Sequence, residues 1–316
     1  MTALLEMKQH LKIFYSRYDI YLVPAIKFIL AFFAFMMLNS QVGFMERIAN
    51  PAIALLLALL CSFLPVNMMA VFGAMLLGAH AFALSLEVFA LLAGLLFIMY
   101  AVYFRVAPGY GYVLVLTPLA FWLKIPYALP LVLGLVGGPA AAVPVGCGAL
   151  IYYMIYFMKN NEKMLSSSES EQMATRLLYL VENMLNNKDM IMTILVLAVI
   201  LMVVYAIRRM NVDYSWYLAL GTGAVANIVL FLIGALIMET DVAILPLILG
   251  TLVSLMIAIA VEFFVFSVDY SRTEYTQFED DEYYYYVKAI PKMSIAIPEK
   301  KVKKINSRSR QGRRRH

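Results

Sequence analysis

The stretch from Tyr110 to Met158 most constrains what this chain can fold into, because it is apolar throughout and Lys124 is its only charged residue. The hydrocarbon core of a bilayer is about 30 Å thick and takes roughly 20 apolar residues per helix. The stretch is therefore too long for one membrane span, and its breaks leave pieces that are short for ordinary ones. The breaks are Pro118, Pro126, Pro130, Pro139, Pro144, Gly134, Gly137, Gly138, Gly146 and Gly148. We predict two or three broken or tightly packed membrane segments, the kind at which transporters bind their substrates.

The composition of the whole chain indicates an integral membrane protein. Hydrophobic residues make up 63% of the 316 residues and charged residues 14%, with a mean hydropathy of +0.81. Soluble domains contain about 45–50% apolar and about 25% charged residues, so most of the apolar surface must face lipid. We predict an all-α, polytopic bundle of membrane helices with a short cytosolic C-terminal tail. We interpret the two cysteines, Cys61 and Cys147, as packing residues within apolar runs.

The alternation of apolar and polar sequence divides the chain into five parts. The first part mixes apolar and basic residues, and we expect either an amphipathic helix on the membrane surface or a frayed start. The parts are a cytosolic amphipathic start (1–20), membrane helices that include the broken stretch (21–158), a polar extracytoplasmic loop with an amphipathic helix (159–188), three membrane helices (189–267) and a cytosolic tail that is first acidic and tyrosine-rich and then basic (268–316).

Apolar length predicts about ten membrane spans. They are Tyr21–Leu38, Pro51–Leu64, Asn67–Ala83, Glu87–Phe104, Tyr112–Leu123, Pro126–Gly137, Ala140–Met158, Met190–Ile207, Trp216–Met238 and Val242–Phe266. The fifth and sixth are so short that they alternatively form a re-entrant hairpin buried in protein, which reduces the count to about eight. Basic residues mark cytosolic loops, and they crowd the start, the Arg208–Arg209 turn and the tail. These basic residues place both termini in the cytosol, which requires an even number of spans, and both counts are even. We expect the membrane to be the plasma membrane.

Polar residues inside or beside spans are the candidates for a transport pathway, because charge in hydrocarbon is costly and tends to be paired or functional. They are Lys27, His80, Arg105, Asn227 and Glu262. Lys27 and Glu262 are near enough in depth to pair, although a snorkelling lysine and an interfacial glutamate are the favoured alternative. We expect His80 to be a hydrogen-bonded packing residue rather than a proton relay, and Asn227 to join two helices.

The helix-breaking residues are the second set of candidates. They are Pro118, Pro126, Pro130, Gly134, Gly138, Pro139 and Pro144. Gly134 and Gly138 are four residues apart, a spacing that allows two membrane helices to approach closely. We favour packing over ligand binding for these glycines.

The tail carries two features that point to partners. Strand-forming residues over Tyr283–Ile290 and Met293–Ile297 follow an acidic, tyrosine-rich segment, so residues 268–298 are expected to add a strand to a cytosolic protein. The basic end, Lys300–Arg315, is expected to bind anionic lipid headgroups of the bilayer. We do not expect nucleic-acid binding, because no base-reading motif accompanies these basic residues.

No catalytic constellation, metal-ligand spacing or phosphate-binding loop is present in the sequence. We therefore expect no enzymatic activity, no metal and no cofactor, and if ATP drives transport a separate ATPase subunit must supply it. The hypothesis that follows is a transporter or permease component of unknown substrate. The alternative is a membrane scaffold that recruits a cytosolic partner through its C-terminal tail.

Overall fold

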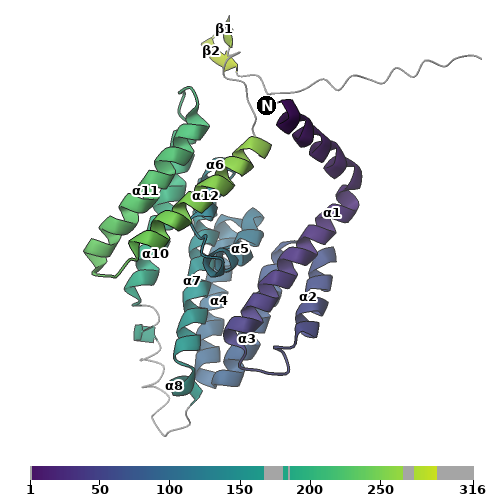
Figure 1. Ribbon diagram of the computed structural model, residues 1–316, viewed down its shortest axis with the longest axis vertical. Coiled ribbons are helices and arrows are strands. Elements are labelled where there is room, and N and C mark those ends of the chain that lie inside the picture. Colours follow the sequence, from purple (N-terminus) through teal and green to yellow (C-terminus); the bar gives the residue numbers. More distant parts are fainter. Residues whose placement is uncertain (1, 167–180, 184–185, 266–273, 290–316) are drawn as a thin grey trace, which may run out of the picture.

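The computed structural model describes residues 2–166, 181–183, 186–265 and 274–289, and it forms a helical bundle with a small β-hairpin at one end (Figure 1). In chain order the elements are α1 (Thr2–Val42), α2 (Pro51–Phe63), α3 (Asn67–Leu84), α4 (Leu86–Val106), η1 (Pro108–Tyr110), α5 (Gly111–Trp122), α6 (Ala128–Val136), η2 (Pro139–Ala141), α7 (Ala142–Asn160), α8 (Glu162–Ser166), α10 (Lys188–Arg208), α11 (Ser215–Met238), α12 (Ile244–Val265), β1 (Glu274–Glu279) and β2 (Tyr284–Ala289).

Seven of the described helices are long and apolar enough to cross a membrane, which agrees with the predicted all-α membrane class. They are α1 from Glu6 onward, α3, α4, α7 with the preceding η2, α10, α11 and α12. α2 is apolar but has only 13 residues. The expected count of about ten spans is not confirmed, because α5 with 12 residues and α6 with 9 residues are each shorter than a bilayer requires.

Short polar side chains and prolines set where many of these helices begin. Asn50, Ser85 and Asn187 precede α2, α4 and α10, and each accepts a hydrogen bond from a first-turn backbone amide. Proline is tolerated in the first turn, where the backbone amide has no partner within the helix. Pro130 and Pro144 occupy the third positions of α6 and α7. These two predicted breaks therefore lie in the first turn of a helix rather than inside one.

The remaining three predicted prolines complete that pattern with one exception. Pro126 lies in the turn that precedes α6, and Pro139 begins η2. Pro118 is the exception, because it is buried in the interior of α5. Without a backbone amide, it leaves the carbonyl of Leu114 without its usual partner in the helix.

α5 and α6 form a helical hairpin rather than two long spans. The chain turns at Lys124, which has a left-handed φ of 59°. The hydroxyl of Tyr110, at the start of the hairpin, bonds to the backbone of Gly138 just after its end. The two open ends of the hairpin therefore meet, and the arrangement corresponds to the re-entrant alternative.

Buried apolar side chains form three clusters that follow the chain. One joins the hairpin and the start of α7 to α10, α11 and α12, with Leu131, Leu197 and Leu201 fully buried in it. A second joins α3, α4 and the end of α7, and a third joins α1, α2 and α3. The hairpin thus lies between an N-terminal group of helices and a C-terminal group.

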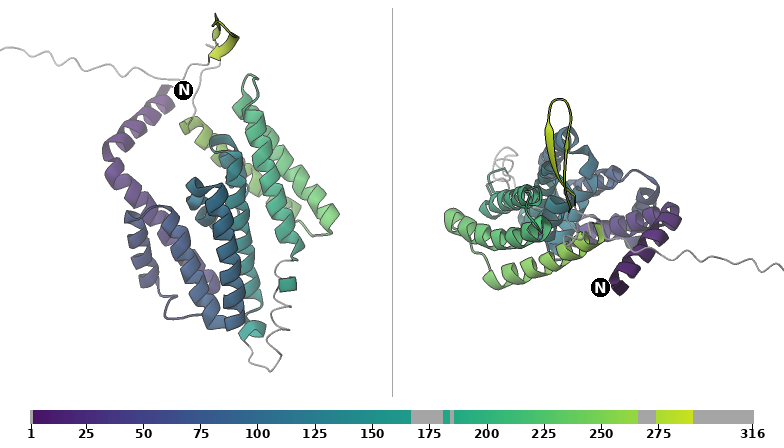
Figure 2. Two further views of the ribbon diagram at one scale, coloured as in Figure 1. Left: turned by 180° about the vertical axis from the view of Figure 1, so that it is seen from behind. Right: turned by 90° about the horizontal axis from the view of Figure 1, so that it is seen from above.

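The start of the chain, the α10–α11 loop and β1–β2, all predicted to be cytosolic, lie at one end of the described part of the molecule (Figures 1 and 2). α1 bends at Tyr18, close to the predicted boundary between the amphipathic start and the first span, and its first part projects toward this end. β1 and β2 pair antiparallel here, and Lys288 of β2 makes an ion pair with Asp213 in the α10–α11 loop. β2 lies within the predicted strand Tyr283–Ile290.

Two further predictions fall outside the described residues in whole or in part. The strand predicted over Met293–Ile297 and the basic segment Lys300–Arg315 lie entirely outside them. Of the amphipathic helix predicted within 159–188, most of the sequence is also outside, and α8 covers only Glu162–Ser166.

Candidate functional site

The turn of the α5–α6 hairpin contacts α12 at a glycine. A Cβ atom on Gly250 would lie 3.1 Å from the ring of Tyr127 and 3.3 Å from the carbonyl oxygen of Lys124. The Tyr127 ring also packs edge-on against Phe231 of α11, with the ring centroids 5.2 Å apart. Gly250 lies about 9 Å along α12 from its first residue. The turn is buried at Pro126 and half-buried at Tyr127, whereas Trp122, Leu123 and Lys124 are exposed on the surface of the bundle.

Three buried polar side chains lie beside this contact, on α11 and α12. Asn227, Thr251 and Ser254 are each at most 1% exposed. The Nδ2 of Asn227 donates to the Thr251 hydroxyl at 2.6 Å, and that hydroxyl donates to the carbonyl of Leu247 at 2.7 Å. Thr251 directly follows Gly250, and Ser254 lies four residues after Gly250, on the same helix face as that glycine. We call Lys124, Tyr127, Asn227, Gly250, Thr251 and Ser254 together the tip site.

Two oxygen atoms of the tip site have no hydrogen-bond partner within the described part of the chain. They are Oδ1 of Asn227 and Oγ of Ser254. Buried polar atoms in folded proteins are nearly always paired with protein or with bound water, and burial without a partner is costly. The tip site therefore offers two buried acceptor oxygens to a hydrogen bond from a bound molecule or water.

The open end of the hairpin is anchored to α10. The guanidinium of Arg208 donates to the carbonyls of Leu135 and Gly137, which belong to the last turn of α6 and its cap. A cation at a helix C-terminus satisfies carbonyls that have no partner inside the helix. A Cβ atom on Gly134 would lie 2.9 Å from the Leu201 carbonyl, so α6 and α10 pack backbone to backbone.

The two glycines predicted to share one helix face do not do so. Gly134 is inside α6 and faces α10, whereas Gly138 lies beyond the end of α6 in an extended conformation. A Cβ atom on Gly138 would make only an ordinary contact, 3.6 Å from the Tyr110 hydroxyl. Of these two glycines, only Gly134 permits a close approach of two helices.

Lys27 and Glu262 do not pair in the structure. Lys27 donates to the carbonyl of Leu64 at 3.1 Å and so caps the end of α2. Glu262 is 1% exposed, accepts a hydrogen bond from Tyr217 and has Lys8 as its cationic neighbour. Lys8 comes from the first part of α1 and donates to the carbonyl of Phe263 at 2.7 Å. The partner of Glu262 is thus a residue that the sequence assigned to the amphipathic start.

His80 and Arg105 lie away from the tip site. His80 is fully buried, its Nδ1 accepts from the amide of Met45 at 3.2 Å, and its Nε2 lies 3.2 Å from Oδ1 of Asn39. These bonds hold the α1–α2 connection and fit a packing role. Arg105 is exposed in the last turn of α4. Among the predicted polar candidates, Asn227 is the one that the structure places in the tip site.

The sequence pattern did not single out the other members of the tip site. Thr251 and Ser254 are three residues apart, so they lie on one side of a helix, and an asparagine interrupts the preceding apolar span. That combination of three polar residues in two consecutive spans was the available signal. Nothing in the sequence marked Tyr127 or Gly250, because their contact depends on which helices pack together in the folded chain.

Comparison with known proteins gives no assignment: no family model, curated protein or solved structure matches this chain. Within the described ranges, no group of three or more histidine, cysteine, aspartate or glutamate side chains is arranged to hold a metal ion. The tip site is therefore interpreted from its own geometry.

Proposed function

We propose that this membrane protein is a transporter or permease component whose solute or ion passes through the tip site. The observation that supports it most is the contact of the hairpin turn with Gly250, beside two buried oxygens that have no hydrogen-bond partner among the described residues. Interrupted helices that meet polar groups inside a membrane bundle are the usual construction of transporter binding sites. Non-helical backbone at such depth is tolerated where it is buried in protein or lines an aqueous cavity.

The proposed topology has eight crossings and a re-entrant hairpin, with both termini in the cytosol and the plasma membrane as the location. The crossings are α1, α2, α3, α4, α7, α10, α11 and α12. α2 is included despite its 13 residues, because His80 near the end of α3 bonds to Asn39 and Met45 at or just after the end of α1, so the chain must return across the bundle between these helices. The support is that the basic start, the Arg208–Arg209 turn and β1–β2 lie at one end of the molecule (Figure 1), and that basic residues favour the cytosolic side. The hairpin then enters from the cytosolic face. A separate ATPase subunit is part of this proposal only if ATP energises transport.

Thiol accessibility tests the pathway without knowledge of the substrate. In a chain with Cys61→Ala and Cys147→Ala, Ser254→Cys is exposed in vesicles to a membrane-impermeant thiol reagent from each face in turn. A pathway predicts modification from at least one face, although Ser254 is fully buried in this structure. Ala81→Cys, equally buried in α3 but outside the tip site, is the negative control.

A positive control in the same vesicles makes a negative result informative. Asn211→Cys lies on an exposed position of the α10–α11 loop and must react completely from the face that we assign to the cytosol. If Ser254→Cys stays unmodified from both faces while Asn211→Cys reacts, the transport proposal is rejected. If Asn211→Cys reacts from the outside of intact cells, the orientation is inverted.

A specific observation favours the scaffold as a second candidate. The two-stranded sheet β1–β2 exposes Tyr275, Phe278, Tyr284 and Tyr286, each more than half accessible to solvent. Such a hairpin is marginally stable alone, and both of its outer edges can accept another strand. A cytosolic protein bound at 268–298 and anionic lipid bound at the basic end would together recruit a partner to the membrane. Comparing pull-downs with and without residues 268–316 tests this, and an unchanged partner list rejects it.

A further inference from the structure

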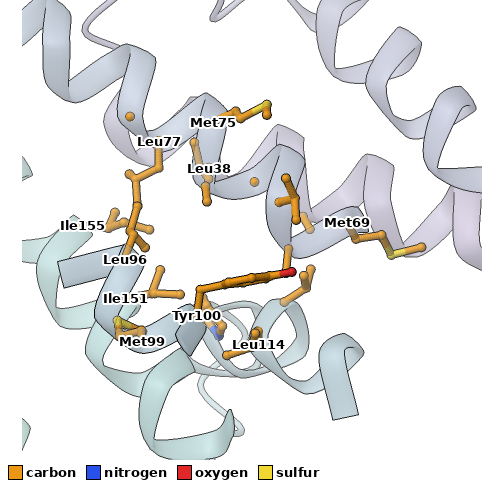
Figure 3. Close-up of a pocket in the computed structure, with 18 of the residues that line it drawn as sticks. Leu38, Met69, Met75, Leu77, Leu96, Met99, Tyr100, Leu114, Ile151 and Ile155 are labelled. Carbon is orange, nitrogen blue, oxygen red and sulfur yellow. The ribbon is translucent and has the colours of Figure 1, made fainter. Parts of the chain in front are cut away.

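A cavity, separate from the tip site, lies among α1, α3, α4, α5 and α7 (Figure 3). Its volume is about 710 Å³. Every side chain that lines it is apolar except Tyr100, which contributes a single hydroxyl. Figure 3 shows Leu77, Leu96 and Ile155 gathered around one part of it and Tyr100 and Leu114 around another. A cavity without charge and with one hydroxyl is unsuited to an ion or a polar solute.

Small residues on one side of α3 create the hollow. Ala70, Gly73, Ala74 and Gly78 all line it, and they recur at the three- and four-residue spacing of a helix face. Such a face usually lets another membrane helix approach closely. Here the nearest atoms to a Cβ on Gly73 or Gly78 are Phe35 and Phe89 side chains, at 3.8 Å and 3.5 Å. The small face therefore borders open volume and aromatic walls rather than a neighbouring backbone.

The dimensions and the rim of the cavity indicate what fills it. Along α3 the lining runs from Met69 to Ala79, a rise of about 15 Å. That is half of the roughly 30 Å hydrocarbon core, the depth of one leaflet. Met75 and Phe97 belong to the lining and are 64% and 74% exposed on the outer surface of the bundle. The cavity therefore opens sideways at α3 and α4, toward the lipid.

We propose that this cavity binds one acyl chain of a bilayer phospholipid, which enters from the side at α3 and α4. The chain matches one leaflet in length, meets apolar walls throughout, and reaches the cavity without leaving hydrocarbon. Leu114 and Pro118 of α5 form part of the wall, so the bound chain touches the hairpin on the side away from α12. This inference does not depend on transport through the tip site.

Crosslinking in an intact bilayer tests the proposal. The full-length protein is reconstituted into vesicles of phosphatidylcholine that carries a photoreactive diazirine near the end of one acyl chain, illuminated, digested and mapped by mass spectrometry. We expect adducts on the lining segments of α3 and α4. Ala93→Phe places a large ring in the cavity from α4 and should reduce those adducts several-fold.

A matched variant and an internal reference separate cavity filling from loss of structure. Ala90→Phe makes the same change one turn earlier on α4, at an exposed position outside the lining, and should leave the adducts unchanged. Adducts on lipid-facing Leu56 and Leu60 of α2 should stay constant in all variants. Equal labelling of the lining in wild type and Ala93→Phe overturns the proposal. So does recovery of a polyprenyl lipid, rather than a phospholipid, as the molecule retained by the purified protein.

Discussion

The backbone amide of Gly138 donates a hydrogen bond to the hydroxyl oxygen of Tyr110 at 3.0 Å. Tyr110 directly precedes α5, and Gly138 follows the end of α6, so this bond closes the open end of the hairpin. The opposite end, at Lys124 and Tyr127, is held by α12. A hairpin fixed at both ends holds Lys124 and Tyr127 in a defined position within the tip site, which the proposed binding role requires.

Removing the Tyr110 hydroxyl is expected to loosen the hairpin. Tyr110→Phe leaves the Gly138 amide without its partner, and the free energy of unfolding should fall by about 1 kcal/mol, the usual worth of such a bond. The measurement is the thermal unfolding midpoint in detergent. Tyr156→Phe, the same change at an exposed position of α7, should leave the midpoint unchanged. Equal midpoints for both variants would show that the bond contributes nothing.

Adding one methyl group distinguishes the two glycines of the hairpin. Gly134→Ala places a Cβ atom 2.8 Å from Cβ of Val204, a distance at which α6 and α10 must move apart. We expect a loss of about 1–3 kcal/mol in stability, typical of overpacking. Gly138→Ala adds a Cβ atom 3.6 Å from the Tyr110 hydroxyl, and its extended backbone suits alanine. The two variants are compared by thermal unfolding, and similar losses would contradict the assigned contacts.

The lengths of the apolar runs, and the residues that end those runs, were sufficient to locate the individual helices. The predicted bounds of the spans after the first agree with α2–α7 and α10–α12 to within two residues at each end. Proline, capping residues and charges end an apolar run wherever it lies, so this information is local. The length of two short helices does not distinguish a pair that crosses the bilayer from a pair that turns back within it, so the sequence alone supports both the crossing and the re-entrant form.

The arrangement of side chains between helices could not be obtained in this way. Lys8 precedes the first predicted span, and Lys27 lies within it. The bend of α1 at Tyr18 brings Lys8 to Glu262, whereas Lys27 stays beside α2. Similarly, the small residues of α3 and Gly134 of α6 look alike in the sequence, because both are small residues within apolar helices. The former border a cavity and the latter touches a backbone, because different helices lie opposite them.

The first part of α1 is expected to stabilise the end of α12 through Lys8. Lys8→Met removes the hydrogen bond to the Phe263 carbonyl and the cation beside buried Glu262. An unpaired buried polar group costs about 1–3 kcal/mol, so the thermal midpoint should fall. Lys12→Met changes an exposed lysine on the same segment and serves as the matched control. If both variants melt together with the wild type, Lys8 does not hold these helices together.

The β-hairpin should lose protection in acid. Asp280 accepts hydrogen bonds from the amide of Glu282 at 2.9 Å, the hydroxyl of Tyr285 at 2.8 Å and the amide of Tyr283 at 2.6 Å. These donors favour the charged carboxylate and hold the pKa of Asp280 below its ordinary value of 3.8. The stabilisation is complete above that ordinary value and is lost as the pH falls through the lowered pKa.

At neutral pH, a substitution should reproduce the effect of acid on this turn. Asp280→Asn keeps the shape of the side chain and removes the charge, so cleavage within 274–289 by a neutral protease should become faster. Asp281→Asn, at the adjacent exposed aspartate, should be cleaved at the wild-type rate. Mass spectrometry of the released fragments gives both rates. Equal cleavage of the two variants would indicate that the Asp280 bonds do not order the turn.

Asn227→Leu should separate stability from access to the tip site. Thr251 keeps its bond to the Leu247 carbonyl at 2.7 Å when Asn227 is lost, and the unpaired Oδ1 of Asn227 disappears. The thermal midpoint should therefore stay constant or rise, since an apolar side chain of similar size removes a desolvation cost of about 1–3 kcal/mol. Access should fall, because the apolar group excludes water: modification of Ser254→Cys should slow several-fold, and Asn227→Ser should preserve it. A large drop in midpoint with unchanged modification would make Asn227 a structural residue outside any pathway.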